Sequence, residues 1–171
     1  MKLYPVKKIN GTITIPGDKS ISHRAIMFAS IAKGDTHITN FLNSADCLST
    51  ISCFEAMGIL IERKDNEVIV HGNGLKGLNK PSKDLDVGNS GTTIRLMSGI
   101  LAAQDFDVTI TGDSTICKRP MGRIIKPLSK MNAQIYSKNF NDCAPLRIKG
   151  SELNGITYIS PVASAQVKSA I

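Results

Sequence analysis

The 171-residue sequence predicts an α+β fold in which one order of elements is repeated: strand, helix, strand, helix and β-hairpin. Polar turns at residues 15–24 and 88–95 each join a short apolar or β-branched run to a helical pattern. Each turn is followed by a second helical pattern and by two alternating runs that close on a glycine, Gly72 or Gly150. This recurrence indicates repeated units rather than two unrelated halves.

The first unit runs from about residue 12 to residue 72. The β-branched residues 12–15, bounded by Gly11 and Pro16, predict its first strand. A turn at Gly17 then leads into a helix that we expect Asp18 or Ser20 to cap. That helix is expected to run through Ala32, followed by a strand at 36–39, a helix at 45–57 stopped by Gly58, and a hairpin of 59–63 and 68–70.

The second unit runs from about residue 85 to residue 150. Arg119-Pro120 is expected to open its second helix, because proline suits the first turn of a helix. Pro127 lies inside that helix, so we expect a kink or an early end there. The other expected elements are a strand at 85–87, a helix through Ala103, a strand at 107–111, and closing strands at 133–137 and 146–148.

Residues 155–171 predict a strand, a turn and the first turns of a helix, after which the chain stops. A helix of one or two turns with no following hairpin is typical of an interrupted unit. We therefore expect an incomplete third unit, with a natural C-terminal helix as the alternative.

Composition limits the class of protein. The chain is 42% hydrophobic and 20% charged, which is ordinary for a soluble globular protein. It carries 21 Lys and Arg against 14 Asp and Glu, a net charge of +7, which favours an anionic partner such as nucleic acid, a membrane surface or a small acidic substrate. Surface lysines that only keep the protein soluble explain most of this excess, but not the cations inside motifs. No run approaches the roughly 20 apolar residues that span a membrane.

The cysteines and histidines predict no metal site. Cys47, Cys53, Cys117 and Cys143 form no C-x-x-C pair, and no histidine lies at zinc-ligand spacing. We expect all four cysteines to be reduced and mostly buried, which fits a cytosolic protein. The N-terminal segment also lacks the apolar core of a signal peptide.

The start of the first helix combines features that favour an anion. Lys19, Ser20 and Arg24 lie at or near a helix N-terminus, where free N–H groups and the helix dipole attract negative charge. Ser20 and Arg24 are four residues apart and therefore share a helix face. The segment lacks the spacing of a P-loop, so nucleotide binding of that type is not expected. The alternative is an ordinary strand–helix junction with solvated charges.

The corresponding positions of the later units are also polar. If the units pack around a common axis, their first helices present their N-termini to one pocket, a suitable site for a multiply charged small molecule. Taken alone, the glycine-rich turn at 88–95 is equally compatible with a purely structural turn. The residues concerned are Asn89, Gly91, Thr92, Arg95 and Arg119 in the second unit, and Ser164, Gln166 and Lys168 in the third.

Four segments together resemble the 5-enolpyruvylshikimate-3-phosphate synthase family, also called 3-phosphoshikimate 1-carboxyvinyltransferases. They are residues 16–24 (PGDKSISHR), 88–95 (GNSGTTIR), 119–120 (RP) and 164–166 (SAQ), in the family's order and at about its spacing. The related UDP-N-acetylglucosamine enolpyruvyl transferases have Asn after the lysine where this chain has Ser20. The resemblance covers the whole chain but only the N-terminal portion of the family.

The resemblance implies an inside-out α/β barrel in which repeated βαβαββ units pack around a common axis. It implies two such domains, so residues 13–171 would be part of the N-terminal domain and residues 1–12 a strand segment belonging to the second. It also implies transfer of the enolpyruvyl group of phosphoenolpyruvate to the 5-hydroxyl of shikimate 3-phosphate, with release of phosphate, in cytoplasmic aromatic amino-acid (chorismate) biosynthesis. Family members are expected to be monomers that use no cofactor and no metal, and to be targets of glyphosate.

The resemblance also implies residue roles. Lys19 would contact both substrates and be the catalytic residue of this part of the enzyme. Gly91 and Arg119 would bind phosphoenolpyruvate, while Asn89, Thr92 and Arg95 would support them. The residues implied for shikimate 3-phosphate are Lys19, Ser20, Arg24, Ser164 and Gln166.

The chemistry needs more than these residues. A carboxylate must take the hydroxyl proton, and the methylene carbon of phosphoenolpyruvate must be protonated. The family places the acidic groups for these steps in the C-terminal domain, so we expect the 171-residue chain alone to be inactive.

Two other interpretations remain. A basic RNA-binding module of related βαβαββ fold should interleave basic residues with stacking aromatics, whereas this chain has three Tyr, five Phe and no Trp. A non-catalytic anion-binding domain would bind shikimate 3-phosphate equally weakly with or without Lys19.

Overall fold

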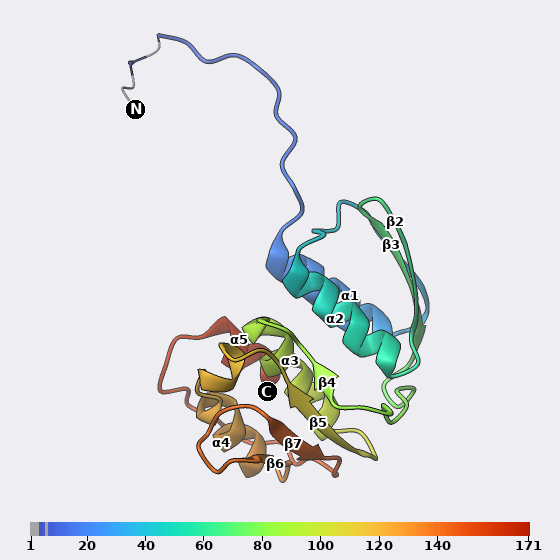
Figure 1. Cartoon of the computed structure of the whole chain (residues 1–171), viewed down its shortest axis with the longest axis vertical. Coiled ribbons are helices and arrows are strands. Elements are labelled where there is room, and N and C mark those ends of the chain that lie inside the picture. Colours follow the sequence, from blue (N-terminus) through green and yellow to red (C-terminus); the bar gives the residue numbers. More distant parts are fainter. Residues whose placement is uncertain (1–3, 6) are drawn as a thin grey trace.

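The computed structural model describes residues 4–5 and 7–171, which form two α/β units side by side, followed by a short final helix (Figure 1). The first unit contains a three-stranded sheet of order β1-β3-β2 in which both pairs are antiparallel. Helices α1 and α2 pack against this sheet and against one another. The elements are α1 Lys19–Ile31, β1 Lys33–Ile38, α2 Ala45–Ala56, β2 Leu60–Lys64 and β3 Glu67–Asn73.

The second unit contains a four-stranded sheet of order β4-β5-β7-β6, in which only β4 and β5 are parallel. Helices α3 and α4 pack on it, and the final helix α5 packs mainly on α3. The elements are β4 Leu85–Asp86, α3 Gly91–Ala102, β5 Asp107–Thr111, the 3-10 turn η1 Ile116–Lys118, α4 Gly122–Lys130, β6 Gln134–Ser137, β7 Leu146–Lys149 and α5 Ala165–Ala170.

The helix, strand, helix and hairpin of the predicted repeat are confirmed in both units by the register of the two sheets. Asp35 lies opposite His71 in the first sheet, and Asp107 lies opposite Lys149 in the second, in each case one residue before the closing glycine. Strands β1, β3 and β2 therefore occupy the places of β5, β7 and β6. The predicted strand at 107–111 has the bounds of β5, and the predicted helix at 45–57 ends one residue early, as α2.

One cluster of buried apolar side chains runs through both units and fixes the helices that carry the polar turns. Helix α2 contributes Ile51 and Phe54, and helix α3 contributes Ile94 and Met97, all with at most 1% of their surface exposed. Because α1 and α2 both contact α3, the N-terminal ends of the three helices are held in fixed relation. No helix in the described residues has the length and apolar character required to cross a bilayer.

Two predicted strands are wrong. Residues 12–15 form no strand, and Ile13 and Ile15 are 84% and 68% exposed. Residues 155–160 also form no strand, and Ile159 is 90% exposed. A β-branched run needs a neighbour that accepts and donates its ladder hydrogen bonds, and neither run lies beside one in the described part of the chain. Of the expected strand segment 1–12, residues 1–3 and 6 lie outside the described residues.

The prediction that Arg119-Pro120 opens a helix is also wrong. Arg119 is extended, with φ −82° and ψ 131°, and ends the 3-10 turn, whereas α4 begins at Gly122. Pro120 instead forms an isolated antiparallel bridge with Cys143, so Met121 is the residue that precedes α4. Pro127 does not end α4 early, because the helix continues to Lys130.

Candidate anion-binding site at the helix N-termini

Helices α1, α3 and α5, the first helix of each unit, each begin at a residue whose side chain caps the helix. Asp18 accepts a hydrogen bond from the Ile21 amide at 2.8 Å, so Asp18 rather than Ser20 is the cap of α1. Ser90 caps α3 through the Thr93 amide at 3.1 Å, and Ser164 caps α5 through the Val167 amide at 3.4 Å. These caps satisfy one orphan amide at each helix start and leave other first-turn amides of α1 and α3 without a partner inside the helix.

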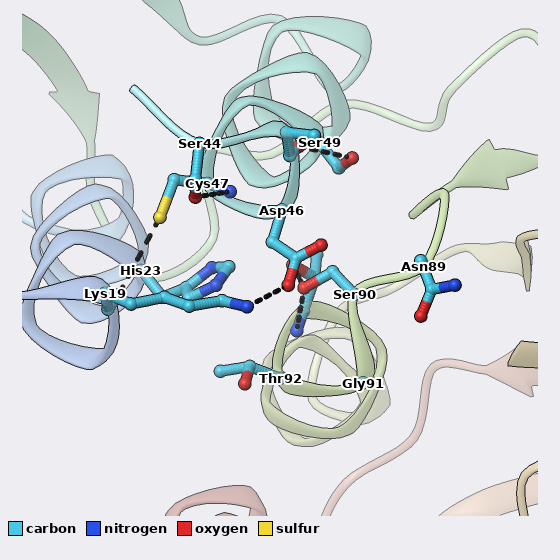
Figure 2. A network of polar contacts seen from close by, with 12 residues as sticks. Lys19, His23, Ser44, Asp46, Cys47, Ser49, Asn89, Ser90, Gly91 and Thr92 are labelled. Carbon is cyan, nitrogen blue, oxygen red and sulfur yellow. Dashed lines mark hydrogen bonds and ion pairs between the residues drawn. The ribbon is translucent and has the colours of Figure 1, made fainter. Parts of the chain in front are cut away.

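Lys19 forms an ion pair with Asp46, which lies in the first turn of α2. The Lys19 side chain is 50% exposed and that of Asp46 is 24% exposed, so the pair is accessible to solvent. Figure 2 shows Lys19 reaching across to Asp46, with Ser90, Gly91 and Asn89 beyond them at the start of α3. The pair therefore places the Lys19 ammonium group between the starts of α2 and α3.

Arg119 is held by a chain of polar contacts. Its Nη2 donates to Asn89 Oδ1 at 2.6 Å, and Asn89 Nδ2 donates to Asp113 Oδ2 at 2.9 Å. Asp113 Oδ1 accepts from two backbone amides, those of Thr115 and Ile116, each at 2.9 Å. The pKa of Asp113 is lowered, chiefly by the Ile116 amide, so this carboxylate is an ionised anchor and not an acid–base group.

Arg95 connects α3 to α5. Its Nη1 donates to Gln166 Oε1 at 2.9 Å and to the Gly91 carbonyl at 3.2 Å. Gln166 Nε2 donates in turn to Thr92 Oγ1 at 3.0 Å. Burial lowers the pKa of Arg95, and the nearby Arg119 and Arg123 guanidinium groups lower it further. Three arginines thus gather at this end of α3, where they favour an anion.

Gly91 lies beneath two of these guanidinium groups. A Cβ atom built on Gly91 would lie 2.7 Å from Arg95 Nη1 and 3.1 Å from Arg119 Nη1. Both distances are shorter than ordinary contacts, so the space beside Gly91 is already used by the two cations. A glycine here lets Arg95 and Arg119 approach the helix start together.

Arg24 and Ser20 form the remaining part of the site on α1. Arg24 Nη2 donates to Ser169 Oγ of α5 at 2.7 Å, and its Nη1 donates to the Ser20 carbonyl at 3.3 Å. Ser20 is exposed on the same face of α1. Contacts from α1 to α5, from α3 to α5 and from Arg119 to the Asn89 turn thus join the segments that carry Arg24, Gln166 and Arg119.

Sequence reasoning missed Asp46 and Arg123. An acidic residue in the first turn of a helix is common, so nothing local to residues 44–47 indicates a partner for Lys19. Arg123 lies in α4, and its nearness to Arg95 depends on how α4 packs against α3. Among residues 4–5 and 7–171, no group of three or more His, Cys, Asp or Glu side chains could hold a metal ion.

Comparison with known proteins decides the family. Residues 3–171 match the family model of EPSP synthase (3-phosphoshikimate 1-carboxyvinyltransferase). The chain belongs to the EPSP synthase family. It is 57% identical over its whole length to the 3-phosphoshikimate 1-carboxyvinyltransferase of Brevibacillus brevis and 61% identical over 99% of its length to that of Bacillus cereus strain G9842. The chain spans about 40% of the length of these curated relatives.

Solved structures agree with the family assignment. An EPSP synthase from Acinetobacter baumannii superposes with a TM-score of 0.91 at 52% identity, covering 94% of this chain and 37% of that one. The predicted α+β fold is therefore confirmed as the fold of this part of an EPSP synthase.

Proposed function

We propose that this chain supplies the phosphoenolpyruvate-binding and shikimate 3-phosphate-binding groups of one domain of an EPSP synthase. The observation that carries the proposal is the convergence of Lys19, Arg95 and Arg119 on the starts of α1 and α3. Cations from separate segments, together with free helix amides, form a site for a small molecule with several negative charges. The relatives' name, 3-phosphoshikimate 1-carboxyvinyltransferase, supplies the reaction.

In that reaction the 5-hydroxyl group of shikimate 3-phosphate gives up its proton to a base, and its oxygen bonds to C2 of phosphoenolpyruvate while C3 gains a proton from an acid. The tetrahedral adduct then loses C3–H and the C2–O bond to phosphate, which restores the double bond and releases inorganic phosphate. Negative charge is present on both substrates throughout. Positioning by fixed cations therefore lowers the barrier without any further group being consumed.

We assign the groups by their place in the site. Lys19, flexible and half-exposed, exchanges Asp46 for substrate oxygens and contacts both ligands. Arg119, with Gly91 below it, binds phosphoenolpyruvate, and Asn89, Thr92 and Arg95 hold this arrangement. The groups assigned to shikimate 3-phosphate are Ser20 and Arg24 on α1, together with Ser164 and Gln166 at the start of α5.

The acid–base steps are not assigned to this chain. Asp18 is engaged as a helix cap and Asp113 as an anchor of the Arg119 turn. We therefore propose that the 171-residue chain binds substrate without turnover and that the rest of such an enzyme supplies the proton transfers. A place in cytoplasmic aromatic amino-acid biosynthesis, and glyphosate binding at the phosphoenolpyruvate position, belong to the same proposal. The family assignment does not support the RNA-binding alternative.

The test is a fused enzyme in which this chain replaces the aligned segment of the Brevibacillus brevis relative. Phosphate release from phosphoenolpyruvate and shikimate 3-phosphate is expected in the fusion. Lys19→Ala should lower kcat/KM by about 100-fold or more, the usual loss when one electrostatic contact to a reacting group is removed. Lys33→Ala, which removes an exposed lysine in β1, is the matched control and should leave the rate unchanged.

Equal rates for the Lys19→Ala and Lys33→Ala fusions would reject Lys19 as a substrate ligand. Phosphate release by the unfused chain would contradict the absence of turnover. Equal weak binding of shikimate 3-phosphate to the unfused chain and to its Lys19→Ala variant would favour a non-catalytic anion-binding domain.

A further inference from the structure

A line of buried polar side chains crosses the three helices beneath the candidate site. His23 Nδ1 lies 2.7 Å from Thr50 Oγ1, and Thr50 Oγ1 lies 2.7 Å from Thr93 Oγ1. Thr93 Oγ1 donates to Ser90 Oγ at 2.6 Å. All four residues have 0% of their surface exposed. Contacts of this length in a dry interior are strong, and breaking one leaves a buried group unsatisfied.

The order of donors along this line defines the state of His23. Thr93 uses its hydroxyl proton on Ser90, so the Thr50 hydroxyl donates to Thr93 at 2.7 Å in preference to the Asp46 carbonyl, which lies 3.5 Å from Thr50 Oγ1. His23 Nδ1 must then carry the proton that Thr50 accepts, which makes Nε2 the unprotonated nitrogen. Nε2 is buried and has no hydrogen-bond partner among the described residues. A neutral ring with an Nδ1–H group is the form that fits these contacts.

The line lies one helical turn behind the site residues. His23 follows Lys19 by four residues on α1, and Thr50 follows Asp46 by four residues on α2, so each pair shares a helix face. The Lys19–Asp46 ion pair and the His23–Thr50 contact therefore join the same two helices one turn apart. Only the second contact continues to α3, where Thr93 and Ser90 flank the start that carries Gly91.

We infer that His23 is a positioning residue, whose Nδ1–H group, acting through Thr50, Thr93 and Ser90, fixes the start of α3 and its Gly91 turn relative to Lys19 on α1. The reason is geometric. The Ser90 hydroxyl oxygen both ends this line and caps α3 by accepting from the Thr93 amide at 3.1 Å. A break at Thr50 would release the Thr93 side chain from α2 and thereby loosen the residue whose amide and hydroxyl both donate to the Ser90 oxygen. The identity of the ligand at Gly91 rests on the proposed function, but the coupling between the helices does not.

Electrostatics at His23 are consistent with a neutral ring. Burial lowers the pKa of His23 to about 4 against the opposing effect of Asp46, and the Lys19 and Arg24 cations lower it further. These are the charged groups that act on the ring, from α1 and α2. At neutral pH, His23, Thr50 and Thr93 therefore each keep their role as hydrogen-bond donor to the next residue of the line.

The experiment is NMR on the ¹⁵N-labelled 171-residue chain without substrate. Long-range ¹⁵N–¹H spectra should show His23, assigned by its loss in His23→Asn, as the neutral Nδ1–H tautomer at pH 7. Thr50→Val removes the central hydroxyl at constant shape, and hydrogen exchange of the Thr93 amide should become about tenfold faster or more. Thr50→Ser keeps the hydroxyl and should restore the slow exchange. The Ile21 amide, capped by Asp18, is the internal control and should not change.

An Nε2–H tautomer in the unmodified chain would overturn the inference, even if Thr50→Val failed to fold. Unchanged Thr93 exchange in a folded Thr50→Val chain would overturn it as well. In the fused enzyme, Thr50→Val should raise KM for phosphoenolpyruvate more than it lowers kcat, and Thr50→Ser should restore KM. An inactive fusion would reject the proposed function while leaving the NMR result to decide the role of His23.

Discussion

Lys19 at the start of α1 is paired with Asp46 in the first turn of α2, so the cation assigned to substrate already has a carboxylate partner. The pair is partly exposed, and an ion pair of this kind contributes about 0–1 kcal/mol to stability. Its main effect concerns binding, because an anion that approaches Lys19 must displace or tolerate Asp46.

Asp46→Asn should therefore tighten binding of an anion at Lys19. We expect inorganic phosphate to bind the 171-residue chain several-fold more tightly, with a change in unfolding free energy below about 1 kcal/mol. Calorimetric titration and urea unfolding measure the two quantities. Glu55→Gln, an equal charge change at the other end of α2, should leave phosphate affinity nearly unchanged. Weaker binding by Asp46→Asn would show that the carboxylate positions Lys19 rather than competes for it.

Gly91→Ala should weaken binding of phosphoenolpyruvate more than binding of shikimate 3-phosphate. The new methyl group would lie 2.7 Å from Arg95 Nη1 and 3.1 Å from Arg119 Nη1, and both are ends of flexible side chains that can move aside. The fold should persist, while KM for phosphoenolpyruvate in the fused enzyme rises by roughly tenfold, about 1.4 kcal/mol, and more than KM for shikimate 3-phosphate. An unchanged KM for phosphoenolpyruvate would contradict the placement of Gly91. Gly11→Ala, with no atom within 4 Å of its new methyl group, is the control.

Gly72 and Gly150 mark the same point in the two units. A Cβ atom at Gly72 would lie 2.1 Å from the Ala29 carbonyl oxygen, and one at Gly150 would lie 1.9 Å from that of Gln104. In each unit, the closing glycine, within β3 or directly after β7, passes the C-terminal end of the unit's first helix without room for a side chain.

Alanine at either glycine should therefore destabilise the protein, because the obstacle is backbone and cannot rotate away. We expect each substitution to lower the unfolding free energy by about 2 kcal/mol or more. Gly155→Ala, which meets nothing within 4 Å, should change it by less than about 0.5 kcal/mol. Urea unfolding measures all three. A loss at only one of the two closing glycines would indicate that the repeat does not extend to this packing contact.

Most of the fold could be predicted from the sequence because most of its elements are marked by local signals. Glycine stops, helical spacing and hairpin turns are local signals, and the elements that they indicated are formed. Strand formation at 12–15 and 155–160 depends on a neighbouring strand, which no local signal reports. At Arg119-Pro120, tertiary pairing prevailed over the preference of proline for a helix start, because Pro120 pairs with Cys143 in an isolated bridge and α4 begins only at Gly122.

For the site, the sequence supplied the cations but not all of their partners. The polar turns predicted Lys19, Gly91 and Arg119 because helix starts favour anions, and the structure brings them together. Asp46 and His23 become informative only through contacts between helices, as partners of Lys19 and Thr50. Such contacts depend on tertiary packing, which residue spacing along one helix does not define.

We expect His71 to stabilise the folded chain at acidic and neutral pH and to lose this contribution at alkaline pH. Its Nδ1 lies 2.7 Å from Asp35 Oδ1 and its Nε2 lies 2.8 Å from Glu62 Oε1, so this one ring on β3 joins β1 and β2. Both carboxylates raise the pKa of His71, Glu62 most strongly. A raised pKa in the folded state gives stability that is present below pH 6.5, the ordinary histidine value, and is lost as pH rises through the folded-state pKa.

Urea unfolding should therefore show the largest difference between the unmodified chain and His71→Gln near pH 6, and a smaller difference near pH 9. His37→Gln, on the exposed face of β1, is the control and should show no such trend. A difference that is constant across this range would mean that the ring is not charged when it bridges the two carboxylates.

His23 predicts a pH dependence of opposite sign. Burial lowers the pKa of His23 to about 4, so below pH 6.5 the ring binds a proton in the unfolded chain but stays neutral in the folded chain. Stability should fall as pH falls from 6.5 towards 4, and this loss should be absent from His23→Asn, which has no group titrating there. The cleanest measurement uses the His71→Gln background, which removes the opposing contribution, and compares it with the double variant by urea unfolding at pH 7, 6 and 5. Parallel curves for the two proteins would show that His23 takes up its proton equally well in the folded chain, and would contradict a neutral, buried ring.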